Sequence, residues 1–364
     1  ENAKRALKKG KKKGVAKEKL KALTQKLVSV KAGNNLIQAP SQAEIQKLLN
    51  HYQNGQYGDA EKLAISITEQ FPEHQFSWKV LGVVLKQTGR ISESLVAGQK
   101  AVDLDPQDAE AHSNLGNTLR ELEKLDEAEA SYRQAIALKS DFAETHNNLG
   151  GLLHARGLGT KSLDCFLRAI LLNPDSVSFR WDFSINQLSK VYLTYDDIKK
   201  SLHGFEVELT KLQEFITAER LDETAEVVGK SQPYYLAYFE IDNKFLLEKY
   251  GEICCRVMKH WQEKNLIAPV NSITKRDAGG KIKIGIVSAH IRYHSVWNAF
   301  LKGVMKNLDS EKFEVHIFSL NDKVDNETDL AKTTARYFNA GERGLTQWAN
   351  KIRNSEIDIA FYPE

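Results

Sequence analysis

A repeat with a period of 34 residues runs from Ser41 to Ser176, and it limits the folds open to this chain. Glycine recurs at positions 82, 116 and 150, each time directly after a leucine, and proline recurs at 72, 106 and 174 with Ser140 in the skipped place. A 34-residue period with Leu-Gly early, small residues in the middle and proline at the end is typical of tetratricopeptide repeats, which are pairs of antiparallel helices. We therefore predict a solenoid of stacked helix pairs.

Four units divide this region. Units 75–108, 109–142 and 143–176 match the pattern at nearly every place. Unit 41–74 keeps Gly55, Ala60 and Pro72 but has Lys47-Leu48 where Leu-Gly is expected, so it is predicted to be a divergent first repeat. The register is expected to stop after Ser176, with helix continuing beyond it.

Asparagines recur at one place in the repeat. The residue before the Leu-Gly pair is expected to face the inner groove of the solenoid, and it is Asn114 in the third unit and Asn148 in the fourth. Asn117 follows three residues after Asn114 on the same helical face. Because an amide both donates and accepts hydrogen bonds, such a row would hold the backbone of an extended polypeptide whatever its side chains. Spacing alone leaves equally open that these residues cap or bond to a neighbouring repeat. His112 and His146 are predicted to pack, not to bind metal.

The positive charge is concentrated at the N-terminus. Of the formal net charge of +3, residues 1–31 contribute +10, with twelve Lys or Arg against two Glu, which leaves −7 on the rest. Residues 1–40 are predicted to be a basic, partly disordered arm. A solvated arm is favoured over one that binds nucleic acid or a membrane surface, since no aromatic residue interleaves the lysines. The apolar runs are too short to cross a bilayer. The three cysteines form no C-x-x-C pair, so a cytoplasmic location is expected.

The pattern changes in the C-terminal half. Residues 177–280 are predicted to be a helical bridge that ends in a hinge at Ala278-Gly279-Gly280. From residue 281, strands are predicted at 281–288, 312–320, 337–339 and 357–362, alternating with helices at 296–308, 328–336 and 345–354. This alternation implies a parallel sheet covered on both faces. The predicted fold class is therefore mainly α, with a tetratricopeptide solenoid followed by the first part of an α/β Rossmann-like lobe at 281–364.

The loop after the first predicted strand is where chemistry is expected, because ligands bind beyond the carboxyl ends of strands in such sheets. Residues 289–295 contain no G-x-G-x-x-G, which argues against an ordinary dinucleotide site. His294 stands directly before Ser295, the predicted N-cap of the helix that starts at Val296. The positive end of the helix dipole would keep this histidine neutral, which suits a general base. A structural role is the commoner one for a loop histidine. No metal-binding motif is present, so no metal is expected.

The order of repeats, bridge and histidine-bearing loop resembles the O-linked N-acetylglucosamine transferases of glycosyltransferase family 41, including the SPINDLY-type and bacterial branch. The resemblance is carried by Lys283–Ser288, His294–Trp297, Lys312–Val315, Ser231–Tyr238 and Leu247–Gly251. It implies a repeat superhelix joined to a two-lobed GT-B transferase, which moves a sugar from a nucleotide donor to Ser or Thr hydroxyls of proteins with inversion and without a metal. It further implies that His294 is the active-site histidine and that Asn114 and Asn148 hold the acceptor peptide.

The resemblance has limits. Arg292-Tyr293 precedes His294 where better-known members carry Gly-Asn. The family's donor site lies mostly in a second lobe, which this sequence does not reach, so the fragment itself is expected to bind peptide without transferring sugar. UDP-N-acetylglucosamine is the favoured donor, with no other cofactor, and GDP-fucose stays open. The alternative function is a non-catalytic scaffold that collects protein partners in the groove.

Overall fold

The computed structural model describes residues 39–239, 241–265, 267, 280–321, 324–342 and 344–362. The described residues form two compact units, which lie within 1–216 and 229–246 and within 217–228 and 247–364. The predicted bridge at 177–280 therefore contributes to both units. The predicted arm at 1–40 and the hinge at 278–280 lie outside the described residues except for residues 39, 40 and 280.

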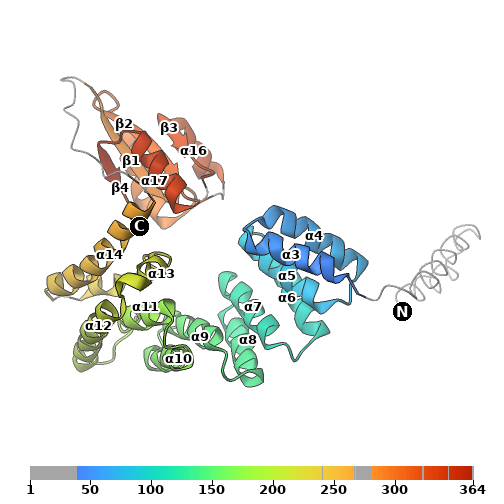
Figure 1. Cartoon of the computed structure of the whole chain (residues 1–364). Coiled ribbons are helices and arrows are strands. Elements are labelled where there is room, and N and C mark those ends of the chain that lie inside the picture. The colour runs from blue at the N-terminus through green and yellow to red at the C-terminus, as the bar shows by residue number, and fades with distance from the viewer. Residues whose placement is uncertain are drawn as a thin grey trace, which may run out of the picture. The chain divides into compact units, whose positions relative to one another are not determined.

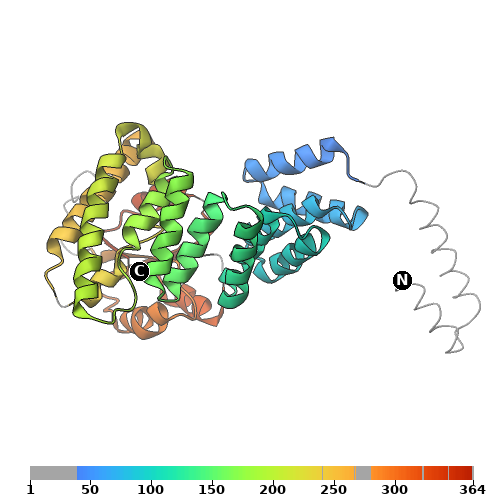
Figure 2. The same ribbon diagram turned by 90° about the horizontal axis from the view of Figure 1, so that it is seen from below.

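The first unit is a row of antiparallel helices in which each helix packs against the next. Figure 1 and Figure 2 show this row in colours from blue to yellow-green. The predicted tetratricopeptide solenoid is confirmed. The helices are α3 (Gln42–Gln53), α4 (Tyr57–Gln70), α5 (Gln75–Gln87), α6 (Ile91–Leu104), α7 (Ala109–Glu121), α8 (Leu125–Leu138), α9 (Ala143–Ala155), α10 (Gly159–Leu172), α11 (Val177–Ile185) and α12 (Tyr195–Phe215).

The Leu-Gly glycines let the two helices of a pair approach closely. A Cβ atom added at Gly116 would lie 2.7 Å from the ring of Tyr132, and one added at Gly150 would lie 2.9 Å from the ring of Phe166. Both rings are buried in the solenoid core. A larger residue would therefore force an aromatic ring out of a packed interior.

The turn inside each of the first four pairs also follows the 34-residue period. Backbone φ is positive at Gly55 (69°), Gly89 (78°), Glu123 (60°) and Gly157 (77°). Glycine adopts this left-handed conformation without the strain that a Cβ atom adds. Glu123 is the one member of this series that carries a side chain.

The joint between successive pairs is held by a recurring side-chain hydrogen bond. Each bond runs from a ring or guanidinium N–H to the backbone carbonyl six residues earlier, where the next pair begins. The bonds are Trp78 to Pro72 (2.9 Å), His112 to Pro106 (3.1 Å), His146 to Ser140 (3.1 Å) and Arg180 to Pro174 (2.9 Å).

The expectation that the register stops after Ser176 is wrong. Arg180 occupies the same place as His146 one unit earlier, and α11 packs between α10 and α12 as the first helix of a fifth pair. The sequence hid this pair because Phe183-Ser184 replaces Leu-Gly. Ser184 is small enough to take the place of the glycine. Its buried hydroxyl donates to the carbonyls of Arg180 (2.8 Å) and Glu208 (3.3 Å).

The second unit contains a four-stranded parallel sheet, as predicted, and the order of its strands is β3-β2-β1-β4. Its strands are β1 (Ile282–Ser288), β2 (Phe313–Ser319), β3 (Tyr337–Asn339) and β4 (Ile359–Phe361). The helices near it are η3 (Val296–Leu301, a π-helix), α15 (Lys302–Asn307), α16 (Asn326–Thr334) and α17 (Leu345–Asn354). The remaining helices in the described ranges are η1 (Ala218–Arg220), α13 (Leu221–Ala225), η2 (Tyr234–Tyr238, in the first unit) and α14 (Lys244–Lys264).

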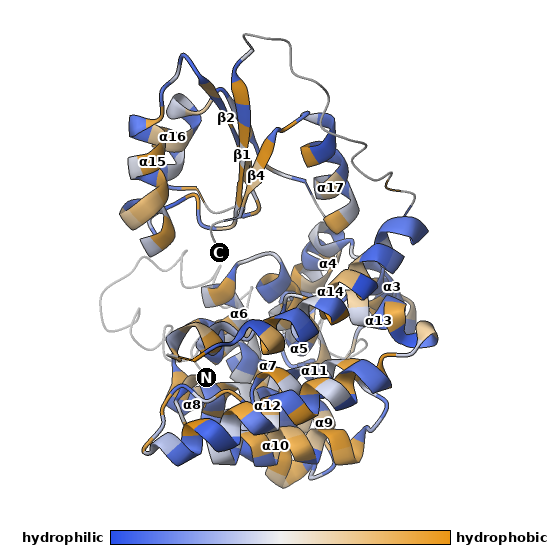
Figure 3. Ribbon diagram, turned by 90° about the vertical axis from the view of Figure 1, so that its left-hand side faces the viewer, coloured by the Kyte–Doolittle hydropathy of each residue, from blue (hydrophilic) through white to orange (hydrophobic). Residues whose placement is uncertain are grey.

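The sheet topology creates one switch point. The chain steps from β1 to β2 to β3 with α15 and α16 on one face, and then returns across the sheet to β4 with α17 on the other face (Figure 3). The strand order therefore reverses between β1 and β4. In open parallel sheets the crevice at the carboxyl ends of two such strands is the usual ligand position, and the loop that carries His294 leaves β1 at this end.

Candidate functional site

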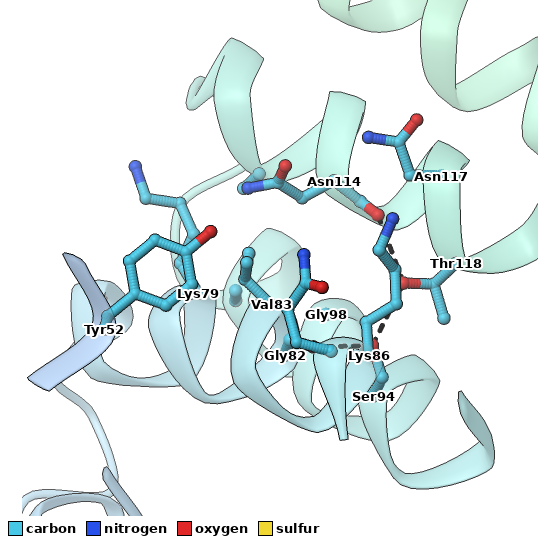
Figure 4. Close-up of a pocket in the computed structure, with 13 residues that line it drawn as sticks. Tyr52, Lys79, Gly82, Val83, Lys86, Ser94, Gly98, Asn114, Asn117 and Thr118 are labelled. Atoms are coloured by element: carbon cyan, nitrogen blue, oxygen red, sulfur yellow. Dashed lines mark hydrogen bonds between the residues drawn. The ribbon is translucent and has the colours of Figure 1, made fainter. Parts of the chain in front are cut away.

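The inner face of the solenoid contains two hollows. The first, shown in Figure 4, has a volume of about 200 Å³ and lies among α3, α5, α6 and α7. The second has a volume of about 970 Å³ and is lined by residues of α7, α9 and α11. Asn114 and Asn117 line both hollows, and Asn148 lines the second. The structure thus brings the three predicted asparagines to one surface.

Two of these asparagines have free amides. Within the described part of the chain, the side chains of Asn114 and Asn148 make no hydrogen bond, so both donors and acceptors are available in the hollow. Their amides neither cap a helix nor bond to a neighbouring repeat. Their binding of a peptide stays a prediction.

Asn117 is different because its oxygen is already used. The hydroxyl of Tyr132 donates to Asn117 Oδ1 at 2.7 Å. Burial raises the pKa of Tyr132 to about 12, so the hydroxyl keeps its proton. Asn117 therefore offers its NH₂ group to the hollow, whereas Asn114 and Asn148 offer both ends of the amide.

Sequence reasoning missed two polar residues next to this row. Asn147 also lines the second hollow, and its Nδ2 donates to Asp182 Oδ2 at 2.8 Å. Asp182 lies on α11, one 34-residue step beyond Asn148. The 34-residue spacing from Asn148 to Asp182 could have identified Asp182, but the repeat was expected to end at Ser176.

The lysines of the first hollow are already neutralised. Lys79 Nζ lies 2.9 Å from Asp108 and 2.7 Å from Glu110, and Lys86 Nζ lies 3.3 Å from Glu121. An anionic ligand would have to compete with these carboxylates. The first hollow therefore favours neutral hydrogen-bonding groups, such as those of a polypeptide backbone.

His294 lies in the loop after β1 and is half-buried. Its Nδ1 accepts the backbone N–H of Val296 at 3.2 Å, and its ring stacks on that of His290 with centroids 3.8 Å apart and planes at 8°. Because Nδ1 accepts a hydrogen bond, the proton of the neutral ring lies on Nε2. In this geometry Nε2 can donate a hydrogen bond to a substrate oxygen, but it cannot take up a proton.

The prediction that Ser295 caps the helix is wrong. Ser295 has helical dihedrals (φ −56°, ψ −45°) and its side chain makes no capping bond. His294 takes this place instead, since its carbonyl accepts the N–H of Asn298 at 2.9 Å and its ring accepts that of Val296. The imidazole Nδ1 has the same reach as the side-chain oxygen of an ordinary cap residue.

The start of α16 holds the histidine loop. Asp325 accepts the backbone N–H of Tyr293 at 2.7 Å, and Thr328 Oγ1 donates to the carbonyl of Ile291 at 2.8 Å. The hydrogen bonds from the Tyr293 and Thr328 backbones keep the pKa of Asp325 below its usual value. Sequence reasoning missed these residues, although Asp325 and Thr328 have the spacing of a capping box.

Neither a metal cluster nor a membrane span is found in the described ranges. No group of three or more His, Cys, Asp or Glu in them could hold a metal ion. None of the helices described there is long and apolar enough to cross a bilayer. The expectation that no metal or other cofactor is needed stays a prediction.

Comparison with known proteins supports the fold. The family model for the TPR repeat matches residues 82–120 and 116–157. No curated protein matches the sequence. A mutant O-GlcNAc transferase of Thermobaculum terrenum matches over 79% of this chain with 19% identity and a TM-score of 0.52.

The chain covers 45% of that transferase, which is less than half of its length. MamA of Desulfovibrio magneticus RS-1 matches over 48% of this chain and 93% of its own, with 16% identity and a TM-score of 0.40. YrrB, a TPR protein with an unusual peptide-binding site, matches over 48% of this chain and 86% of its own, with 16% identity and a TM-score of 0.39. At these identities the similarity concerns the fold alone.

Proposed function

We propose that this chain is part of a protein O-glycosyltransferase of the family 41 type, which transfers N-acetylglucosamine from UDP-GlcNAc to Ser or Thr of cytoplasmic proteins. One observation carries the proposal. A solenoid with free amides on its inner face is followed, in the same chain, by a parallel sheet with His294 at the carboxyl end of β1. The Thermobaculum terrenum O-GlcNAc transferase has a similar fold over 79% of this chain.

The solenoid would hold the acceptor. Asn114 and Asn148 are one repeat apart, and each can accept a peptide N–H and donate to a peptide carbonyl. Asn117 adds a donor between them. Since all three would contact the backbone, the groove would accept polypeptides of many sequences.

The sheet would contribute part of the reaction centre. Among the described residues, Nε2 of His294 has no hydrogen-bond partner, so it is free to bind a substrate oxygen. A hydrogen bond from Nε2–H would orient an acceptor hydroxyl or stabilise negative charge that develops on a donor oxygen. The transfer would be inverting and metal-independent.

The direct test is an activity assay on the full-length protein with a protein acceptor and labelled UDP-GlcNAc or GDP-fucose. Transfer from UDP-GlcNAc is the expected result. Transfer from GDP-fucose alone would make the protein an O-fucosyltransferase. The absence of transfer from both donors would overturn the proposal.

The role of His294 is tested by His294→Asn. Asparagine keeps an acceptor for the Val296 N–H but removes Nε2, so the loop should stay folded. We expect kcat to fall by about 10²-fold or more, the usual range for a lost hydrogen bond to a developing oxyanion, with little change in donor KM. His260→Gln on α14 is the control and should keep kcat. A kcat of His294→Asn equal to the wild type would remove His294 from the reaction centre.

A non-catalytic scaffold is the second candidate, because the amide-lined hollow needs no sugar chemistry. In either case Asn114→Ala plus Asn148→Ala should weaken acceptor binding by about tenfold or more, since each lost hydrogen bond is worth about 1 kcal/mol. Gln134 is exposed on the outer side of α8, so the control variant Gln134→Ala should leave acceptor binding unchanged. Peptide binding without transfer in the full-length protein would favour the scaffold. Binding unchanged by the asparagine pair would refute the amide row in both.

A further inference from the structure

A segment from outside the repeats lies on the inner face of the solenoid. The hollow-lining residues of α9 include Asn147 and Asn148. The equivalent places on α11, 34 residues later, are Trp181 and Asp182. Ser231 contacts both of them, although it is about fifty residues away along the chain.

These contacts use the groups that any bound polypeptide offers. The hydroxyl of Ser231 donates to Asp182 Oδ1 at 2.8 Å, and its carbonyl accepts from Trp181 Nε1 at 3.3 Å. Asn147 donates to the other oxygen of Asp182 at 2.8 Å, which connects this contact to the wall of the second hollow. Asp182 and Trp181 therefore bind a serine of this chain at the next step of the asparagine row.

A second contact lies one helix pair earlier. The ring of Tyr235 packs edge-on against His154 with centroids 5.8 Å apart. His154 lies two repeats beyond Lys86, which lines the first hollow, so it too is on the inner face. Leu236 is 1% exposed. The segment from Ser231 to Phe239, called the resident segment below, thus covers inner-face residues of the fourth and fifth pairs.

We propose that the fifth helix pair is a further polypeptide-binding position of the groove, and that the resident segment is its built-in occupant. An acceptor that extends past Asn148 would displace this segment and place a Ser or Thr hydroxyl on Asp182 and a backbone carbonyl on Trp181. A shorter acceptor would bind to Asn114 and Asn148 and leave the segment in place. This inference rests on the proposed groove function, but not on sugar transfer.

Competition with the resident segment depends on its tether. The resident segment is joined to Asp182 by the intervening residues, which include α12 and α13, so it is an intramolecular competitor that a free peptide at low concentration cannot displace well. Loosening the segment without altering the groove should therefore raise the apparent affinity of a free peptide. Ser231→Ala plus Tyr235→Ala is such a variant, because it leaves Asp182, Trp181 and His154 intact.

The experiment measures, by fluorescence anisotropy, binding of a labelled synthetic peptide with the sequence of residues 229–239 to the full chain. The double variant should bind it at least about tenfold more tightly than the wild type, by removal of the tethered competitor. A peptide with Ala in place of its serine should lose most of this gain. Tyr238→Phe, which removes an exposed hydroxyl that lies 2.8 Å from the hydroxyl of Tyr234, is the control and should bind like the wild type.

Amide hydrogen exchange checks the variant. Residues 231–239 should lose protection while α9, α10 and α11 keep theirs. If α9, α10 and α11 keep their protection in the double variant, equal peptide affinity of this variant and the wild type would overturn the inference. If α9–α11 also lose protection, the single variant Ser231→Ala is tested instead. It should bind the peptide more tightly than the wild type, by a smaller factor than the double variant. Equal affinity of Ser231→Ala and the wild type would overturn the inference. Failure of the asparagine pair to affect acceptor binding would instead count against the proposed function.

Discussion

Glu123 adopts a backbone conformation that glycine adopts at the equivalent places of the other three turns. A residue with a Cβ atom is less stable by about 1–2 kcal/mol in the left-handed region. Glu123→Gly should therefore raise the free energy of unfolding by up to about 1 kcal/mol, after the added entropy of a glycine in the unfolded chain is subtracted. Urea denaturation of the variant and the wild type measures this difference in the free energy of unfolding.

Gly89 provides the reverse test. A Cβ atom at Gly89 meets no atom within 4 Å, so Gly89→Ala changes the backbone energy without a clash. It should lower the free energy of unfolding by about 1 kcal/mol. Shifts of the same sign for Glu123→Gly and Gly89→Ala would contradict the strain argument.

His154 makes stability depend on pH. Burial lowers its pKa, and Lys190 acts in the same direction, against the opposing effect of its hydrogen bond to Leu188. In the unfolded chain a histidine binds a proton near pH 6.5, whereas the folded protein binds it only at lower pH. Unfolding therefore takes up a proton in this window, and stability should fall as the pH decreases below about 6.5.

The measurement is urea denaturation at pH 7.5 and 5.5 for the wild type and for His154→Gln. Glutamine can still donate to the Leu188 carbonyl but does not titrate. The variant should lose less stability between the two pH values than the wild type. An equal loss would assign the pH dependence to other groups.

At the scale of elements, the start of α16 supports the loop that carries His294. Thr328 is 2% exposed and donates to the Ile291 carbonyl. Thr328→Val keeps the shape but leaves this carbonyl unpaired, which should cost about 1–3 kcal/mol. Amide exchange in residues 289–295 should become faster. Thr333→Val, on the exposed side of the same helix, is the control and should leave amide exchange in that loop unchanged. Equal exchange rates in the two variants would show that Thr328 does not stabilise the loop.

The elements differ in how far sequence could predict them. The helix pairs and the parallel strands follow from periodicity, because Leu-Gly spacing and alternation of strand and helix are local patterns. The cap of η3 could not be predicted, since Ser and His compete for it and only the loop path selects His294. The fifth pair was hidden by Ser184 in place of glycine. The contact of Ser231 with Asp182 depends on folding across 49 residues, which no local pattern encodes.

At the scale of the whole molecule, the two units have separate hydrophobic cores. In the described residues, several clusters of buried side chains lie in the helix pairs, and another surrounds Trp297 against the sheet. Gly150→Ala should destabilise the first unit by about 1–3 kcal/mol, because the new Cβ overlaps the buried Phe166 ring. Gly58→Ala, with open space around it, is the matched control and should not destabilise.

Separate cores predict separate unfolding transitions. Gly150→Ala should shift only the transition of the helix pairs, and Thr328→Val only that of the sheet, with additive effects in the double variant. Amide exchange resolved by segment distinguishes the two. A single transition that both substitutions shift by equal amounts would show that the units unfold together.

The hydrogen bonds at positions 78, 112, 146 and 180 have a consequence for how such chains diverge. Indole, imidazole and guanidinium groups all donate to the equivalent carbonyl of their own repeat. Selection at this position therefore requires a side chain that is long enough and carries an N–H group, and it does not require one residue type. Substitution can therefore proceed there through chemically unrelated side chains while the superhelix keeps its pitch. Scoring by amino-acid similarity will undercount units in distant relatives, whereas scoring by donor geometry would retain them.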